Sequence, residues 1–175
     1  RRTLARAEID LGDAEAGKAI LLGLVETDGE DVESLQLLAE NALKQREKDD
    51  ADPIALGREA TGYLRRAYAA DPDNYLTLYL LGRARIGQPG YPTDNDMEIW
   101  GEAFHLAPQL DEIRINTAQA LLIRDRKAEA IAVLTPLANS PHSGGAGIAR
   151  AMLARARGEG EHAADETPDP VPPEG

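Results

Sequence analysis

Residues 11–16 read LGDAEA, and residues 123–130 read IRDRKAEA. In each stretch one segment with a helical apolar period ends and another begins. Two helical hairpins therefore share the same kind of corner, one near each end of the chain. A corner that recurs indicates internal repeats, and repeats have to be identified first because they determine the whole fold.

A small or apolar residue recurs where paired helices must approach closely. The series is Ala5, Leu24, Ala39, Ala67, Gly82, Ala103, Ala118 and Leu137. The step from the second helix of one hairpin to the first helix of the next is 15 residues each time, from 24 to 39, from 67 to 82 and from 103 to 118. The steps inside the hairpins vary, at 19, 28, 21 and 19 residues. Stacked hairpins should show this combination, because packing between hairpins fixes the connection while solvent tolerates a variable loop.

Steps of 19 and 15 residues add to 34, and at this length the chain resembles the tetratricopeptide repeat (TPR) family of helix-turn-helix units. The resemblance covers residues 1–142. Matching positions include Leu35, Leu38, Ala39, Ala60, Leu64, Ala67, Pro72, Leu78, Leu81, Gly82, Ala103, Pro108, Ala118, Ala130 and Leu134. Departures from the family pattern are Gly29, Arg85, Arg114 and Thr117. The resemblance implies an all-α fold, a right-handed α-solenoid of about four TPR-like units.

The composition agrees with an all-α fold. Leu and Ala together supply 51 of the 175 residues, whereas Val supplies four, so the chain is rich in helix formers and poor in β-branched residues. We expect a TPR-like helical repeat domain over residues 1–158 and an acidic, proline-rich, disordered tail over residues 159–175. Helices are expected at residues 1–11, 13–26, 31–48, 53–70, 73–86, 94–107, 110–124 and 126–138, with a C-terminal capping helix at 145–157.

Several helix ends are also predictable. Asp13 and Asp73 are positioned to cap the second and fifth helices, Thr93 precedes an acidic first turn, and Pro53 suits a first helical position. The second hairpin is nine residues longer than the first, and we expect this excess to lengthen both of its helices by about a turn.

Charge and composition limit the classes of function that this chain can have. The net charge of −12 opposes nucleic acids and anionic lipid surfaces as main partners, and no apolar run approaches the ~20 residues needed to span a bilayer. The absence of cysteine excludes disulfides and thiolate chemistry. Because the first residue is Arg1, we interpret the chain as a fragment or processed product of a soluble protein. Its localisation stays unknown, since a targeting signal could lie outside it.

Three patterns that could hold a ligand are each better explained structurally. Glu102 and His105 have the spacing of a di-iron ligand motif, but the second motif that such a site requires is absent. Residues 94–98 begin like a calcium loop without its glycine, and residues 143–147 resemble a phosphate loop without its Lys-Ser/Thr. We interpret them as a helix-surface pair, an acidic first turn and a flexible join. No catalytic residue, metal site or cofactor is expected, because the sequence contains neither HExxH nor GxSxG.

In the TPR family the first helices of successive units line a groove that holds an extended peptide or a helix. By resemblance the partner-binding residues here are Arg6, Gln36, Glu40, Lys44, Leu76, Tyr79, Arg83, Ile115 and Gln119, with Arg2, Glu33 and Glu112 beside them. Their helical spacing alone places each set on one face, although an ordinary solvated face would look similar. The set lacks the Lys and Asn pairs with which chaperone-binding members hold a carboxylate.

The leading hypothesis is a protein-protein interaction scaffold that binds a peptide or helix of a protein partner in this groove. A second hypothesis is the non-catalytic C-terminal repeat region of a larger bacterial protein with a metallopeptidase-like domain, because residues 105–108, 111–114 and 136–142 loosely resemble such regions. A third is a self-association module, because an unpaired end of a repeat stack can pack on another copy.

Overall fold

The computed structural model describes residues 1–158, so the predicted tail lies outside the described residues. Within this range the chain forms nine α-helices and no strand, which confirms the all-α prediction. The chain divides into two compact units, with the boundary between Gln109 and Leu110. Among the described residues, no helix is both long enough and apolar enough to cross a membrane.

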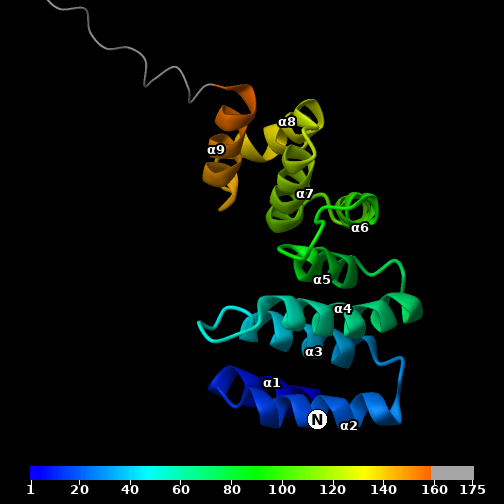
Figure 1. Ribbon diagram of the computed structural model, residues 1–175. Coiled ribbons are helices and arrows are strands. Elements are labelled where there is room, and N and C mark those ends of the chain that lie inside the picture. The colour runs from blue at the N-terminus through cyan, green and yellow to red at the C-terminus, as the bar shows by residue number, and fades with distance from the viewer. Residues whose placement is uncertain (159–175) are drawn as a thin grey trace, which may run out of the picture. The chain divides into compact units, whose positions relative to one another are not determined.

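Unit 1 contains six helices, arranged as three successive hairpins (Figure 1). The helices are α1 (Arg2–Leu11), α2 (Ala14–Thr27), α3 (Val32–Gln45), α4 (Pro53–Ala70), α5 (Tyr75–Arg85) and α6 (Asp94–Leu106). The first helices of the hairpins pack in a row, α1 on α3 and α3 on α5, and we call this row the A layer. The second helices form the B layer: α2 packs on α1 and α3, α4 on α3 and α5, and α6 on α5.

The close-approach positions predicted from the 15-residue step lie at the centre of this packing. Ala5, Ala39, Ala67 and Ala103 are all fully buried. Gly82 is also such a position, because an added Cβ would overlap the indole of Trp100 and the ring would have to shift. Leu24 is the exception in unit 1. It is only partly buried, and its neighbours Leu21 and Val25 fill the core of the first hairpin instead.

Most of the predicted helix ends are confirmed. The Asp13 carboxylate accepts a hydrogen bond from the Ala16 N–H at 3.0 Å, Thr93 caps α6, and Pro53 opens α4. The prediction for α5 was wrong by one residue. Asn74 is the cap, and its Oδ1 accepts from the Thr77 N–H at 3.2 Å. The neighbouring Asp71 carboxylate accepts from the amide nitrogen of Asn74, which orients the amide oxygen toward the helix.

The second hairpin only partly follows the prediction that both of its helices are longer. Helix α4 does extend to 18 residues, but α3 has 14 and ends at Gln45. The rest of the excess lies in the connection. There the Arg46 guanidinium donates to the carbonyls of Ile86 and Arg83, at 3.2 and 3.3 Å. Helix α3 therefore ends at the point where the Arg46 side chain crosses to the C-terminal end of α5.

A buried carboxylate fastens α5 to α6. The Asp96 side chain is fully buried and accepts hydrogen bonds from Arg85 Nε at 2.8 Å, from the Thr93 N–H at 2.8 Å and from the Thr93 hydroxyl at 2.9 Å. Thr93 and Asp96 complete a capping box at the start of α6. Burial by itself raises the pKa of Asp96, but the hydrogen bonds from Arg85 and Thr93 outweigh it, so the pKa lies below the ordinary value.

Unit 2 contains α7 (Asp111–Ile123), α8 (Lys127–Ala138) and α9 (Ala146–Arg157). Each of these three helices contacts the other two, and α9 occupies the position predicted for the capping helix. The unusual Arg114 is used in packing, since its Nη1 donates to the Val133 carbonyl of α8 at 2.6 Å.

The glycine-rich segment before α9 differs from the flexible join that we expected. The Asp111 carboxylate accepts hydrogen bonds from the Ser143 hydroxyl and, at 3.1 Å, from the Gly145 N–H. This carboxylate thereby supplies the first turn of α9 with an acceptor, because Gly145 has no side chain with which to cap the helix. The segment is therefore anchored to the start of α7.

Gly82→Ala should destabilise unit 1 by about 1–3 kcal/mol, because the new methyl group overlaps the indole in a close-packed core. Gly62→Ala is the matched control. Gly62 is an exposed position in α4 with no atom within 4 Å of an added Cβ, and alanine there should stabilise the helix by about 0.5–1 kcal/mol. Urea unfolding of the two variants distinguishes the outcomes, and equal shifts in the same direction would contradict the packing described here.

The Asp96 network predicts an acid-sensitive contribution to stability. Because the pKa of Asp96 is lower in the folded than in the unfolded chain, the contribution is complete above the unfolded value of about 3.9 and is lost as the pH falls through the folded value. Asp96→Asn should cost about 2–4 kcal/mol at pH 7 and much less at pH 2. Urea midpoints across this range measure the difference. Asp50→Asn, in an exposed loop, should show no such pH-dependent loss.

Candidate functional site

A shallow depression of about 500 Å³ lies on the A layer of unit 1. All three helices of the layer contribute to it, and its lining residues are Arg2, Thr3, Arg6, Glu33, Gln36, Leu37, Glu40 and Leu76. A smaller hollow of about 80 Å³ shares Arg6, Leu37 and Glu40 with it and continues toward Lys44. We call these two continuous depressions the A-face groove.

The structure places seven of the nine expected binding residues in unit 1. Arg6, Gln36, Glu40 and Leu76 line the larger depression, and Lys44 lines the smaller one. Tyr79 and Arg83 follow Leu76 at helical spacing along α5, but neither lines the two depressions. The other two belong to α7 of unit 2, where Ile115 is half-buried and Gln119 is exposed, and neither lines the two depressions.

Ion pairs between α1 and the N-terminal part of the second hairpin occupy one end of the groove. Arg2 lies 2.7 Å from the Asp31 carboxylate and 3.0 Å from that of Glu33, and Arg6 lies 3.9 Å from Glu40. Burial alone would raise the pKa of Asp31, but hydrogen bonds from Ser34 and the Arg2 charge lower it overall. Exposed pairs of this kind contribute only about 0–1 kcal/mol each, so a charged ligand can exchange them at little cost.

Gln36 is a groove residue whose side chain is buried and bonded to another hairpin. Its Nε2 donates to the Asn74 amide oxygen at 3.0 Å and to the Thr77 hydroxyl at 2.9 Å. These bonds join the middle of α3 to the cap of α5, across 38 and 41 residues of sequence. Gln36 therefore holds two hairpins in register, in addition to forming part of the groove wall.

An aromatic ring and two guanidinium groups lie beyond Leu76, outside the two depressions that define the groove. Arg83 Cζ lies 5.8 Å from the centroid of the Tyr79 ring, and the same ring meets Trp100 edge to face at 6.3 Å. Because Trp100 is fully buried, Tyr79 is held in one orientation. Burial and then the neighbouring Arg83 lower the pKa of Arg46. Within residues 1–158, neither Arg46 nor Arg83 forms an ion pair with an acid.

Two residues of this surface were missed by sequence reasoning. Leu37 lines both depressions, although an apolar residue at this position of the sequence predicts a core residue. Arg46 lies just beyond the end of α3, and nothing local indicates that it reaches α5. Neither residue had a sequence signal that distinguished it from an ordinary core or loop position.

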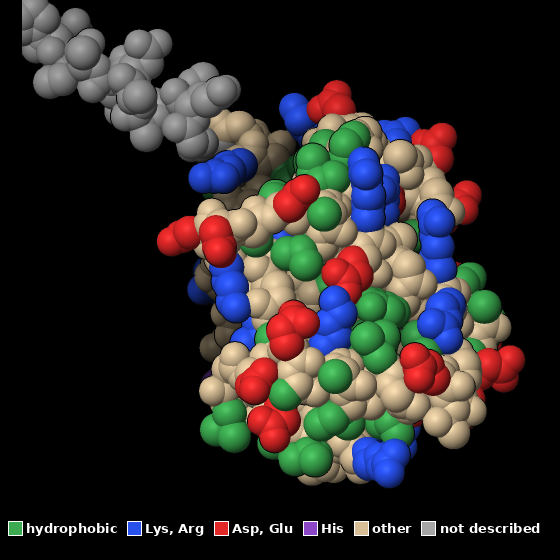
Figure 2. Space-filling view, turned by 60° about the horizontal axis from the view of Figure 1, so that its bottom comes forward, with side chains coloured by type: hydrophobic (Ala, Val, Ile, Leu, Met, Phe, Trp, Pro, Cys, Tyr) green, Lys and Arg blue, Asp and Glu red, His purple; other side chains and the backbone are tan. Residues whose placement is uncertain are grey.

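The two sequence patterns of α6 that could hold a ligand form ordinary parts of that helix. Glu102 and His105 lie exposed on α6, and residues 94–98 form the first turns of that helix, as expected from the acidic pattern. In the part of the chain that the structure describes, no group of three His, Cys, Asp or Glu side chains is arranged to hold a metal ion. Acidic and basic side chains alternate on the face shown in Figure 2, so no single-sign field dominates it.

Several solved structures are similar to this chain over most of its length. A crystal structure of MamA matches with a TM-score of 0.65 at 15% identity, covering 91% of this chain and 96% of that one. Another MamA structure matches with a TM-score of 0.63 at 16% identity, covering 96% and 94%. TTC0263, a thermophilic TPR protein of Thermus thermophilus, matches with a TM-score of 0.58 at 16% identity, covering 90% and 79%. No family model and no curated protein sequence matches the chain.

These likenesses establish the fold class. The chain has the fold of a TPR-like, all-α helical repeat protein, as the 15-residue step and the 34-residue unit predicted. The family resemblance inferred from single residues thus agrees with a comparison of whole backbones.

Gln36→Ala should reduce stability by about 1–3 kcal/mol, because the Thr77 hydroxyl and the Asn74 amide lose a buried partner. Glu33→Ala, on the same helix but exposed, should change stability by less than about 0.5 kcal/mol. Thermal unfolding of the two variants provides the comparison. If Gln36→Ala were as stable as Glu33→Ala, Gln36 would have no role in joining the hairpins.

Proposed function

We propose that this chain is a protein-interaction scaffold that binds an extended peptide or a helix of a protein partner along the A-face groove. The observation that supports the proposal is the groove itself, a continuous depression to which α1, α3 and α5 all contribute side chains. A ligand lying across it contacts three separate hairpins at once. The proposal assigns the chain no catalytic role.

The dimensions suit a short peptide. Packed helices lie about 8–10 Å apart, so a ligand that crosses the three helices of the A layer spans about 20 Å. An extended chain covers that distance with about six residues. The half-buried Leu37 and Leu76 offer apolar contact along this path, and the ion-paired residues beside them offer hydrogen-bond partners.

Two side chains of α5 that follow Leu76, beside the groove, have the character of an anchor. Tyr79 is an aromatic residue held against the buried Trp100, and Arg83 lies over its ring. Tyrosine and arginine are over-represented among the residues that dominate binding energies, because both combine a large contact area with directional polar groups. Since Arg83 and Arg46 form no ion pair among the described residues, we propose that an acidic residue of the ligand is placed at this anchor. Ile115 and Gln119 on α7 would form a further contact surface.

The test is a pair of substitutions at the anchor. Peptides selected against the chain from a displayed random library should bind Tyr79→Ala/Arg83→Ala more weakly by about 1–3 kcal/mol, because both anchor side chains are truncated. Fluorescence anisotropy with a labelled selected peptide measures the Kd, and thermal unfolding verifies that the variant is folded.

Ile54→Ala/Arg58→Ala is the control. It removes an exposed apolar side chain and an arginine from α4, at positions that line neither depression, and should leave the Kd of a selected peptide unchanged. If the anchor variant bound every selected peptide as tightly as this control, the proposed anchor on α5 would be contradicted.

A further inference from the structure

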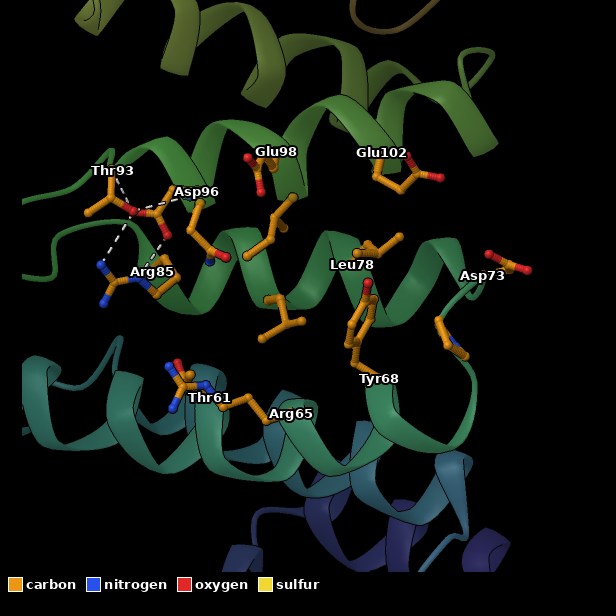
Figure 3. A pocket seen from close by; sticks show the side chains of 14 residues that line it. Thr61, Arg65, Tyr68, Asp73, Leu78, Arg85, Thr93, Asp96, Glu98 and Glu102 are labelled. Atoms are coloured by element: carbon orange, nitrogen blue, oxygen red, sulfur yellow. Dashed lines mark hydrogen bonds and ion pairs between the residues drawn. The ribbon is translucent and has the colours of Figure 1, made fainter.

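A second and larger cavity, of about 730 Å³, lies on the B layer between α4 and α6. Its walls are a stripe of α4 that includes Arg65 and Tyr68 and a stripe of α6 that includes Glu98 and Glu102, while Leu78 of α5 forms part of the floor (Figure 3). We call it the B-face cleft. It lies on the opposite layer from the groove, so the function proposed above leaves it unexplained.

One end of the cleft is rigid and electrically neutral. It is closed by the network of Arg85, Thr93 and Asp96, in which the guanidinium group is already paired with the buried carboxylate. Figure 3 shows these three side chains pointing toward one another at this end. The network gives the cleft a fixed shape before any ligand arrives, which lowers the entropic cost of binding.

The rest of the cleft has an excess of negative charge. Glu98, Glu102 and Asp73 are exposed, and none of them forms an ion pair with a described residue. Arg65 is the one lining cation, within the described part of the chain, that lacks an acidic partner. Three acids against one base leave the lining at −2, which favours a cationic ligand.

The uncharged lining residues narrow the choice of cation. Tyr68 is 43% exposed at the edge of the cleft, and the half-buried Ile99 provides apolar surface between the two walls, above the buried Leu78. A guanidinium group stacks on an aromatic face and pairs with carboxylates in two-pronged geometry, while its aliphatic stem covers apolar surface. Arginine can therefore pair with the acids, stack on Tyr68 and cover the apolar surface, whereas the compact ammonium group of lysine stacks less well on an aromatic ring.

The spacing of the acids fits two arginines of an extended chain. Glu98 and Glu102 lie four residues apart on one helix, so their Cβ atoms are about 6 Å apart. In an extended segment, residues i and i+2 point to the same side and lie about 6.5–7 Å apart. The lining stripe of α6, from Asn95 to Glu102, is about 10 Å long, enough for three extended residues.

We propose that the B-face cleft binds an Arg-x-Arg segment of a protein partner in extended conformation. The two guanidinium groups pair with Glu98 and Glu102, and one of them stacks on Tyr68. Arg65 opposes the ligand and sets an upper limit on its affinity. Binding at the B-face cleft does not depend on the A-face groove, so a variant that loses ligand binding at one site can keep it at the other.

The probe is a fluorescein-labelled peptide, Gly-Ser-Arg-Ser-Arg-Ser-Gly, with Lys and Glu versions of the same peptide for comparison. Glu98→Gln/Glu102→Gln should weaken the Arg peptide about five- to tenfold, since two exposed ion pairs are lost. Arg65→Gln should tighten it about twofold, because a like charge is removed. Tyr68→Leu should reduce the preference for the Arg peptide over the Lys peptide, because the stacking surface is lost.

Two control variants separate this site from general charge and from the groove. Glu26→Gln/Glu30→Gln removes the same charge at the same spacing around the end of α2, and Tyr79→Ala/Arg83→Ala removes the groove anchor. Both should bind the Arg peptide as the unaltered chain does. The proposal is overturned if the Glu98/Glu102 variant binds the Arg peptide like the Glu26/Glu30 control, or if the Glu peptide binds as tightly as the Arg peptide.

Discussion

The contact between Trp100 and Gly82 supports both surfaces of unit 1. The indole is fully buried against Gly82 of α5, where an added Cβ would overlap the ring, and its Nε1 donates to the Tyr91 hydroxyl at 2.9 Å. On the A layer the same indole holds the ring of Tyr79. On the B layer it fixes the α6 helix that carries Glu98 and Glu102. One close approach of two helices thus positions side chains on opposite faces.

Buried polar links complement this packing. Helices with a core of mainly Leu and Ala can pack in many nearly equivalent ways. A buried hydrogen bond forms in only a few of these arrangements, because donor and acceptor must meet. Gln36 joins α3 to α5 and Asp96 joins α5 to α6, and in unit 2 the partly buried Asp111 joins the start of α7 to the start of α9. Each link crosses between elements that the apolar pattern alone would leave free to slide. We infer that these links set the register in which the helices stack.

The repeat, most helix ends and the A-layer face were predictable from the sequence because each depends on local spacing. The 15-residue step reflects helix packing, and the side chains of Asp13 and Thr93 act on backbone groups only three residues away. Three long-range contacts were not predictable: the hydrogen bonds of Gln36 to α5, those of Arg46 to the end of α5, and those of Asp111 to the glycine-rich segment. Their partners lie 32 to 41 residues away, and no local pattern encodes such pairings. The B-face cleft was missed for the same reason, since two helices must be placed before their acids and aromatics meet.

The most direct test of the central claim is to locate a library-selected peptide on the chain by NMR. A spin label on the peptide should broaden the amide signals of α1, α3 and α5 in unit 1, with the strongest effects around Leu37, Leu76 and Tyr79. Broadening confined to α2, α4 and α6, or to no defined face, would contradict the assignment of the A-face groove as the binding surface.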